Sequence, residues 1–165
     1  LFDALTNLPN RRGIQKFIVH EINRARRQQE DLTLILCDID RFKQVNDNYG
    51  HDGGDIALKH VADLFKETIR EQDGVARWGG EEFLFVLPTT NENNGVVLAE
   101  KIRETLQSTP VPIKNTSLTI TASFGVAQIH LENGLNNALS LADKALYRAK
   151  ENGRNKVLSA SSLAP

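Results

Sequence analysis

The chain has 165 residues, of which 40% are hydrophobic and 25% are charged, and its formal net charge is -1. This is the size and composition of one globular domain with a substantial core, and the balanced charge argues against a nucleic-acid partner. The single cysteine, Cys37, lies within the apolar run LTLILCDI, so we expect a buried thiol and a reducing compartment.

The chain carries no sign of membrane insertion or export. It has no run of about eighteen apolar residues and no signal-peptide layout. We therefore expect a soluble domain of the cytoplasm, with a tether to the inner membrane through a missing N-terminal region as the alternative. The chain begins at Leu1 and contains no methionine, so we expect a domain excised from a longer protein.

Apolar residues follow helical and strand periodicities in alternation. Helical spacing predicts a helix over residues 10 to 29, and a nearly continuous apolar run predicts a central strand, covered on both faces, over residues 32 to 39. A helix is predicted over residues 57–69, followed by strands over 74–78 and 83–87 that flank a Gly-Gly-Glu-Glu turn. A helix over residues 98–106, a strand with two unlike faces over 118–129 and a helix over 135–149 complete the chain. Gly153 is placed to end the last helix, and the polar tail 159–165 is expected to fray.

The order of these elements predicts the fold class. Strand, helix, strand, strand, helix, strand, with extra helices, fits a split βαβ arrangement of the ferredoxin-like type. We therefore predict an α+β domain over residues 1 to 158 whose first strand lies beside the central hairpin. This arrangement would bring Asp38, and in one interpretation also Asp40, near Glu81 and Glu82.

Four carboxylates are the first candidates for chemistry. Asp38 and Asp40 stand where an apolar strand ends, and an acidic pair at such a place is more often solvated or capping. The glycine pair 79–80 can supply the positive φ that a hairpin turn needs, whereas the carboxylates of Glu81 and Glu82 repel each other there unless water or a cation neutralises them. Together the four carboxylates suit a hard divalent cation such as Mg²⁺, whose natural companion is a phosphate-bearing substrate.

The segment RFKQVNDNYGHDGGD, residues 41 to 55, supplies candidate contacts to a nucleotide. Backbone N–H groups that open a helix at Arg41 and Phe42, together with the side chain of Lys43, can hold an anion. Asn46 and Asp55 can read the edge of guanine, because a carboxylate accepts two N–H groups and an amide can donate to an oxygen or ring nitrogen.

The same segment has a simpler interpretation, which composition alone favours. It makes Asn46, Asp47, Asn48 and Gly50 turn formers, and Asp55 the N-cap of the next helix. His51 is more often a loop or packing residue than a ligand, and no second histidine stands at metal-ligand spacing from it.

Two further pairs of charged residues also have alternative interpretations. Lys150 and Arg154 flank a helix terminus, and in the simpler interpretation these cations complement the helix dipole. In the alternative, that end of the helix faces the carboxylates and both residues hold a triphosphate. Arg70 and Asp73, in REQD, are on local grounds a surface ion pair worth under about 1 kcal/mol.

Four segments resemble, in order, the signatures of the GGDEF family, the diguanylate cyclases that make cyclic di-GMP from two GTP molecules. They are DALTNLPNRR at 3–12, DIDRFKQVNDNYGHDGGD at 38–55, RWGGEEF at 77–83 and ADKALYRAKENGRN at 142–155. The likeness spans nearly all of the chain, and Glu81 replaces the aspartate of the family name, a variant found in active members. The resemblance implies a palm-like fold, with a mostly antiparallel central sheet wrapped by helices.

The resemblance also implies roles for individual residues. Asp38, Glu82 and the Ile39 carbonyl would bind metal, and Glu81 would be either a further ligand or the base near the attacking 3′-hydroxyl, which makes the two glutamates the catalytic pair. Asn46 and Asp55 would recognise guanine. The phosphates would be bound by Arg41, Phe42, Lys43, Lys150 and Arg154. Arg70 and Asp73 would form the core of an inhibitory RxxD site for the product.

The implied reaction is two-metal phosphoryl transfer with two Mg²⁺ or Mn²⁺ ions in each GTP-loaded half-site. Each GTP must attack the other, so the resemblance implies a homodimer, with cyclic di-GMP as product and inhibitor and a sensor or regulatory domain before Leu1. The rival hypotheses are an idle domain that binds GTP or cyclic di-GMP, a cyclase with another nucleotide choice, and a structural scaffold, which would leave the four motifs unexplained.

Overall fold

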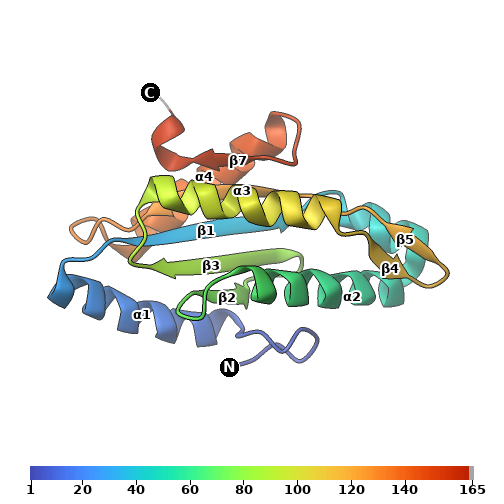
Figure 1. Cartoon of the computed structure of the whole chain (residues 1–165), viewed down its shortest axis with the longest axis horizontal. Helices are drawn as coiled ribbons and strands as arrows, with labels where there is room; N and C mark the ends of the chain where they lie inside the picture. The colour runs from blue at the N-terminus through green and yellow to red at the C-terminus, as the bar shows by residue number, and fades with distance from the viewer. Residues whose placement is uncertain (164–165) are drawn as a thin grey trace.

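A five-stranded sheet runs through the middle of the structure, a computed structural model that describes residues 1–163 (Figure 1). In spatial order its strands are β2 (Gly74–Arg77), β3 (Glu82–Pro88), β1 (Leu32–Ile39), β6 (Ala122–Gln128) and β7 (Val157–Ser159). Neighbouring strands are antiparallel except β7, which pairs with β6 in parallel. The predicted α+β fold with a mostly antiparallel central sheet is confirmed.

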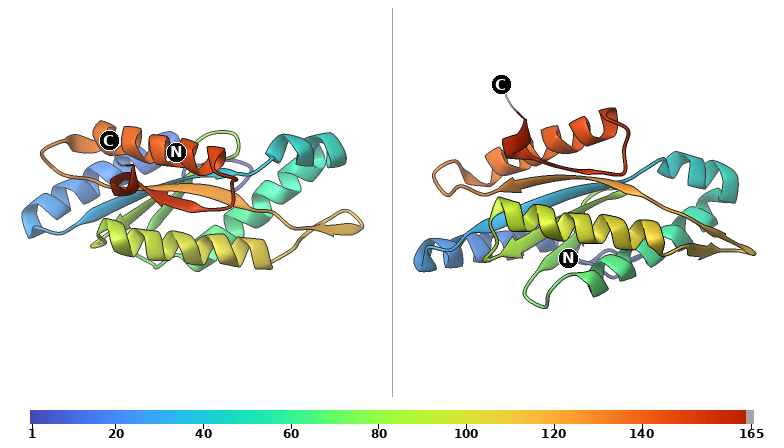
Figure 2. Two further views of the ribbon diagram at one scale, coloured as in Figure 1. Left: turned by 90° about the horizontal axis from the view of Figure 1, so that it is seen from above. Right: turned by 45° about the horizontal axis from the view of Figure 1, so that its top comes forward.

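Helices cover both faces of this sheet (Figure 2). The helices α1 (Arg11–Gln28) and α4 (Gly134–Glu151) pack on one face, and α2 (Phe42–Thr68) and α3 (Glu92–Ser108) pack on the other. Successive side chains of a strand point to opposite faces, so Leu34 and Leu36 belong to the first layer and Ile35 and Cys37 to the second. Every residue of β1 is buried, as the continuous apolar run predicts.

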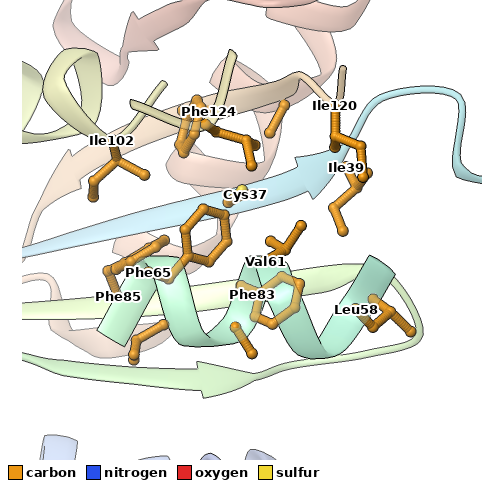
Figure 3. Close-up of a cluster of buried hydrophobic side chains, with 14 of the residues drawn as sticks. Cys37, Ile39, Leu58, Val61, Phe65, Phe83, Phe85, Ile102, Ile120 and Phe124 are labelled. Carbon is orange, nitrogen blue, oxygen red and sulfur yellow. The ribbon is translucent and has the colours of Figure 1, made fainter. Parts of the chain in front are cut away.

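The core beneath α2 is built around aromatic rings (Figure 3). Phe65 of α2 packs edge-on against Phe83 and Phe85 of β3, with ring centroids 5.2 and 5.1 Å apart. Cys37 lies fully buried in the same cluster, and burial raises the pKa of its thiol. The expectation of a buried cysteine is confirmed.

Helix ends follow the local sequence. The Asn10 side chain accepts a hydrogen bond from the Gly13 N–H at 2.9 Å, and the Asn91 side chain accepts one from the Asn94 N–H at the same distance. Gly153 follows the C-cap of α4 with a φ of 113°, so the predicted glycine stop is confirmed.

The middle of α2 corrects the turn interpretation of residues 46 to 50. The helix already begins at Phe42 and runs to Thr68, with a break at Gly50, whose φ is 74° and ψ 172°. Asn46, Asp47 and Asn48 are therefore helical, and Asp55 lies within the second half of the helix instead of capping it. Only Gly50 has the turn role, because its positive φ lets the chain change direction there.

The strand predicted over residues 118 to 129 is shorter and differently exposed. Residues 111–113 and 116–118 form a separate hairpin, β4 (Val111–Ile113) and β5 (Thr116–Leu118), and β6 begins only at Ala122. Both faces of β6 are buried, because α4 covers the second face. A Cβ on Gly125 would lie 2.1 Å from the Ala142 carbonyl oxygen, so glycine is what allows α4 to approach so closely.

The tail is ordered further than expected. Ser159 ends strand β7, and η1 (Ala160–Ser162) is a short 3₁₀-helix, so the expected fraying from residue 159 is wrong as far as residue 163. The rest of that prediction, residues 164–165, lies outside the described residues. None of the helices within residues 1–163 combines the length and apolar character that a membrane span requires.

Candidate functional site

Antiparallel register brings two predicted carboxylates face to face. In the pairing of β1 with β3, Asp38 stands directly opposite Glu82, and the next residue, Ile39, donates its N–H to the Glu81 carbonyl at 3.1 Å. The end of the first strand thus lies beside the Gly-Gly-Glu-Glu turn, as the ferredoxin-like order predicts.

The turn itself differs from the expectation about its glycines. Glycines 79 and 80 are not among the residues with positive φ. The N–H groups of Trp78 and Gly79 both donate to the Glu82 carbonyl, at 2.8 and 3.2 Å, and close the turn. A Cβ on Gly79 would lie 3.4 Å from the Glu82 carboxylate, and one on Gly80 would meet nothing within 4 Å. Gly79 is therefore the glycine that leaves room beside the Glu82 carboxylate, whereas Gly80 faces open space.

The carboxylates are held in an electrostatically unfavourable arrangement. Burial raises the pKa of the Asp38 carboxyl, and the nearby charges of Glu81 and Asp40 raise it further. Burial also raises the pKa of Glu82, and the negative charge of Asp38 adds to this effect. Lys150 of α4 forms an ion pair with Asp38 and is the cation that lowers both pKa values. The site therefore carries several negative charges, which the ammonium group of Lys150 neutralises only in part.

The donor chemistry fits a divalent cation, although the side chains are not arranged as a finished cage. Within residues 1–163 no three Asp, Glu, His or Cys side chains form a group that could hold a metal ion. Asp38 and Glu82 nevertheless present carboxylate oxygens at the ends of adjacent strands, and a hard cation with bound phosphates needs only one or two protein carboxylates. In the structure Lys150 supplies a positive charge beside Asp38, where such an ion would also supply one.

Asp40 does not belong to this cluster as a free carboxylate. Its Oδ2 accepts hydrogen bonds from the Thr121 hydroxyl at 2.7 Å and the Asn155 N–H at 2.9 Å, and its Oδ1 accepts one from the Ser123 hydroxyl at 2.7 Å. The strand ends at Ile39, so Asp40 does not share a strand face with Asp38. Asp40 lines the same pocket as Asp38 and Glu81, as expected, but its two oxygens already accept three hydrogen bonds from the protein.

A pocket of about 190 Å³ joins the carboxylates to most of the predicted phosphate-binding residues. Its lining residues are Asp38, Ile39, Asp40, Arg41, Phe42, Lys43, Glu81, Lys150 and Arg154. Helix α2 opens on this pocket. Its N-cap residue, Arg41, has a φ of 54° and makes no side-chain capping bond, and no acidic residue lies in the first turn. The first amides of α2 are therefore suited to an anion.

The two predicted guanine-reading residues lie outside that pocket's lining, on either side of the break in α2. Asn46 is half-buried and Asp55 is exposed. A Cβ on Gly54 would lie 1.9 Å from the Asn46 Oδ1, so the side chain of Asn46 lies directly over the residue that precedes Asp55. Across the break at Gly50, the Asn46 side chain thus lies against Gly54, the chain neighbour of Asp55.

Arg70 and Asp73 form a buried clamp instead of a simple surface pair. Arg70 donates from Nε and Nη2 to the two Asp73 oxygens, at 3.0 and 2.7 Å, and Nη2 also donates to the Pro88 carbonyl and the Thr90 hydroxyl. The Asp73 side chain is 0% exposed and that of Arg70 is 44% exposed. The hydrogen bonds to Asp73 raise the pKa of Arg70. Within residues 1–163 the Nη1 group of Arg70 has no hydrogen-bond partner.

The chain matches a known protein family. The model of the family "Diguanylate cyclase, GGDEF domain" matches residues 1–156. The chain belongs to the GGDEF domain family. This GGDEF domain is 39% identical over 157 residues to diguanylate cyclase DgcP of Pseudomonas aeruginosa, an alignment that covers 95% of the chain and 23% of DgcP. The chain thus spans about a quarter of that relative's length.

Solved structures show the same fold. The GGDEF domain of DgcB from Caulobacter crescentus, in complex with c-di-GMP, has a TM-score of 0.90 and 32% identity, with 96% of this chain and 92% of that chain covered. The active GGEEF domain of a diguanylate cyclase from Vibrio cholerae has a TM-score of 0.85 and 36% identity, with 93% and 97% covered.

Two features of the GGDEF domain's site escaped the sequence analysis. Arg77 contacts both carboxylate oxygens of Asp3 at 3.2 Å and donates from Nε to the Gly80 carbonyl at 3.0 Å, while the Arg11 guanidinium lies 4.0 Å from the centroid of the Trp78 ring. The N-terminal segment is therefore fastened to the GGEE turn. The family signatures contain these residues, but nothing in their spacing indicates a contact across so many positions.

The second missed feature is Asp143 on α4. Its negative charge helps to raise the pKa of Glu82. Asp143 and Lys150 are seven positions apart, about two helical turns, and so lie on one side of α4. That spacing is a signal that could have placed Asp143 near the carboxylates once Lys150 was assigned to them.

Proposed function

We propose that this GGDEF domain is a diguanylate cyclase that condenses two GTP molecules into cyclic di-GMP and releases two pyrophosphates. The observation that carries the proposal is the pocket in which the opening turn of α2, Lys150 and Arg154 lie beside Asp38 and Glu81. Helix amides and cations suit the phosphates of a nucleotide, and paired carboxylates suit the divalent ions that accompany them. DgcP and the GGEEF domain of Vibrio cholerae, which are diguanylate cyclases, support the assignment.

We assign the divalent ions to Asp38, Glu82 and the Ile39 carbonyl, with two Mg²⁺ or Mn²⁺ ions for each GTP-loaded half-site. When bound, they would neutralise the phosphates and stabilise the attacking and leaving oxygens of the displacement. The chain's own part is to hold two carboxylates in register on adjacent strands before any ion arrives. Glu81 stands beside them as a further ligand or as the base for the 3′-hydroxyl.

The phosphates would be held from two directions. The amides around Arg41 and Phe42, with Lys43, approach from α2, and Lys150 and Arg154 approach from the end of α4. In the reaction the 3′-hydroxyl oxygen of one GTP forms a bond to the α-phosphorus of the other, and the bond from that phosphorus to pyrophosphate breaks. The hydroxyl proton passes to a base, and the same step in the opposite direction closes the ring.

Asn46 and Asp55 would recognise guanine. The Asp55 carboxylate can accept both N–H groups of the guanine edge, and the Asn46 amide can donate to its oxygen or ring nitrogen. The contact of Asn46 with Gly54, the residue next to Asp55, supports this assignment, because the two residues belong to different halves of a broken helix.

Product inhibition would act through Arg70 and Asp73. A second pocket, of about 280 Å³, is lined by Arg70, Thr89, Thr90, Asn94, Val97, Leu98 and Lys101. The partly exposed guanidinium of Arg70 retains donors that the clamp does not use, and such donors suit the phosphates of cyclic di-GMP. The complex of DgcB with c-di-GMP supports a product-binding role for the domain.

The proposal is tested by incubating the purified domain at high concentration with GTP and Mg²⁺ and measuring cyclic di-GMP and pyrophosphate. We expect equal amounts of nucleotide-derived pyrophosphate and consumed GTP. The variant Asp55→Ala should need about ten times more GTP for the same rate, whereas Asp52→Ala, which removes an exposed acid from the same half of α2, should not. If GTP binds but no product forms, even when a fused coiled coil brings two copies together, the domain is a nucleotide receptor and the proposal fails.

A further inference from the structure

Asp40 joins three separate parts of the chain. It accepts hydrogen bonds from Thr121 before β6, from Ser123 within β6, and from the Asn155 N–H in the loop between α4 and β7. All three distances lie between 2.7 and 2.9 Å, and the acceptor is a carboxylate, which makes strong hydrogen bonds. Asp40 is therefore equipped to fix this loop against the sheet.

The loop needs such an anchor, because its backbone is disfavoured. Gly153, Arg154 and Asn155 have φ values of 113°, 64° and 48° in succession. Glycine adopts positive φ freely, but the two residues that follow it have side chains and do so at a cost. Asn155 is held at both ends: its N–H bonds to Asp40, and its Oδ1 accepts a hydrogen bond from Arg103 Nη1 of α3 at 3.1 Å.

The direction of the Arg154 side chain depends on this backbone. Arg154 lines the pocket that contains Asp38 and Lys150, yet its guanidinium has no hydrogen-bond partner within residues 1–163. Within residues 1–163 no hydrogen bond or ion pair of its own side chain holds the cation at the pocket. The left-handed backbone at residues 154 and 155 sets the point from which this side chain extends.

We propose that Asp40 is a positioning residue, which holds Arg154 at the phosphate pocket by anchoring the Asn155 N–H. The inference rests on the proposed function, since it takes Arg154 to bind a phosphate of GTP. It gives Asp40 a role distinct from those of the carboxylates beside it. Asp40 acts on the nucleotide through the backbone of another loop, and not as a metal ligand.

A double-mutant cycle on nucleotide binding tests the inference. The probe is a GTP analogue with a methylene bridge between the α- and β-phosphates, titrated in the presence of Mg²⁺ so that binding is measured without turnover. Asp40→Ala, which removes both acceptor oxygens and with them the bond to the Asn155 N–H, is expected to raise the Kd about tenfold, since displaced positioning contacts have effects of this size. In the Arg154→Ala background the same change should raise the Kd less than about twofold.

The outcomes separate this inference from the proposed function. If Asp40→Ala raises the Kd by the same factor with and without Arg154, Asp40 acts by another route and the inference is overturned. If the parent domain neither binds the analogue nor forms product, it is the proposed function that fails.

A matched control and a fallback guard against a general loss of structure. Ser123→Ala removes the Oδ1 partner but leaves the bond to Asn155, so its Kd should stay within about twofold of the parent value. A tenfold rise in that variant would indicate that the sheet, and not the loop, transmits the effect, and would contradict the inference. Should Asp40→Ala unfold, Asp40→Ser, whose shorter side chain does not reach the Asn155 N–H, is put through the same cycle and must show the same dependence on Arg154.

Discussion

Glu82 shows how a functional residue can oppose the stability of the fold that carries it. Its folded-state pKa is raised by burial and by the charge of Asp38, so the ionised form costs free energy in the folded protein. Lys150 offsets part of this cost through Asp38. The remaining negative charge is what a bound divalent ion would satisfy, so the same feature that weakens the metal-free domain favours ion binding.

The variant Glu82→Gln should therefore be more stable than the parent domain without metal, and much less active. With EDTA present, its thermal midpoint should lie above that of the parent at pH 7. Both states of the parent are protonated at Glu82 below the unfolded-state pKa, so the difference should vanish in acid and grow as pH rises through the folded pKa. Cyclic di-GMP formation at ordinary Mg²⁺ should fall at least about a hundredfold.

The control for this prediction is Glu132→Gln, which neutralises an exposed glutamate far from the turn. It should change neither the thermal midpoint nor the rate appreciably. Full activity of Glu82→Gln at ordinary Mg²⁺ would remove Glu82 from the ligand set. A lower midpoint in EDTA would show that Glu82 stabilises the fold.

At the scale of the elements, the Arg70–Asp73 clamp fastens the end of α2 to the beginning of β2 and the end of β3. Asp73 is completely buried at its side chain, while Arg70 is half-exposed. Removal of one partner should therefore cost a different free energy from removal of the other. An Asp73 left alone keeps a buried charge, whereas an Arg70 left alone can be hydrated where it stands.

This inequality gives a prediction for chemical denaturation. Arg70→Ala should lower the free energy of unfolding by about 3 kcal/mol, because it strands a buried carboxylate, and Asp73→Ala should lower it by only about 1 to 2 kcal/mol. Glu71→Ala, in the exposed turn between them, should have little effect. Equal costs for the two partners would mean that Asp73 is hydrated or protonated once Arg70 is removed.

The same variants bear on product inhibition. Arg70→Ala is expected to relieve inhibition by cyclic di-GMP, and unaltered inhibition would leave the clamp with a structural role alone. Because Arg70 is also a stabilising residue, the inhibition assay should be run well below the unfolding temperature of the variant.

At the scale of the whole molecule, the proposed reaction joins two GTP molecules, whereas each domain has one phosphate pocket of the kind described. The phosphate pocket holds about 190 Å³ and is formed at one end of the sheet by the loops after β1 and α4. Such a site can present one GTP, and a reciprocal attack needs a second GTP held in the opposite orientation. We therefore expect catalysis to require two copies of the domain facing each other.

The rate should then depend on the square of the domain concentration while dimers are scarce. Doubling the concentration of the isolated domain should raise the initial rate of cyclic di-GMP formation about fourfold at low concentration and about twofold once dimers predominate. Sedimentation at the same concentrations provides the control. A rate strictly proportional to concentration, with only monomer present, would contradict the requirement for two copies.

The sequence by itself determined the elements and much of the chemistry. The apolar runs and helical stripes were sufficient for α1, β1, α3 and α4, because burial of one face or both imposes a period on the sequence. The order of elements was sufficient to set Asp38 opposite the GGEE turn. The resemblance of four motifs to the GGDEF family named the remaining residues of the site.

Only the tertiary structure decided how those residues divide their tasks. Asp38 and Asp40 look alike in DID, but Asp38 pairs with Lys150 and Asp40 anchors Asn155, since their partners come from segments more than a hundred positions away. Local composition favoured a turn at Asn46, and packing over Gly54 made it helical. Periodicity reports which side of an element is buried. It does not report which distant side chain meets that side, and at this site the distant partners are what distinguish Asp38 from Asp40.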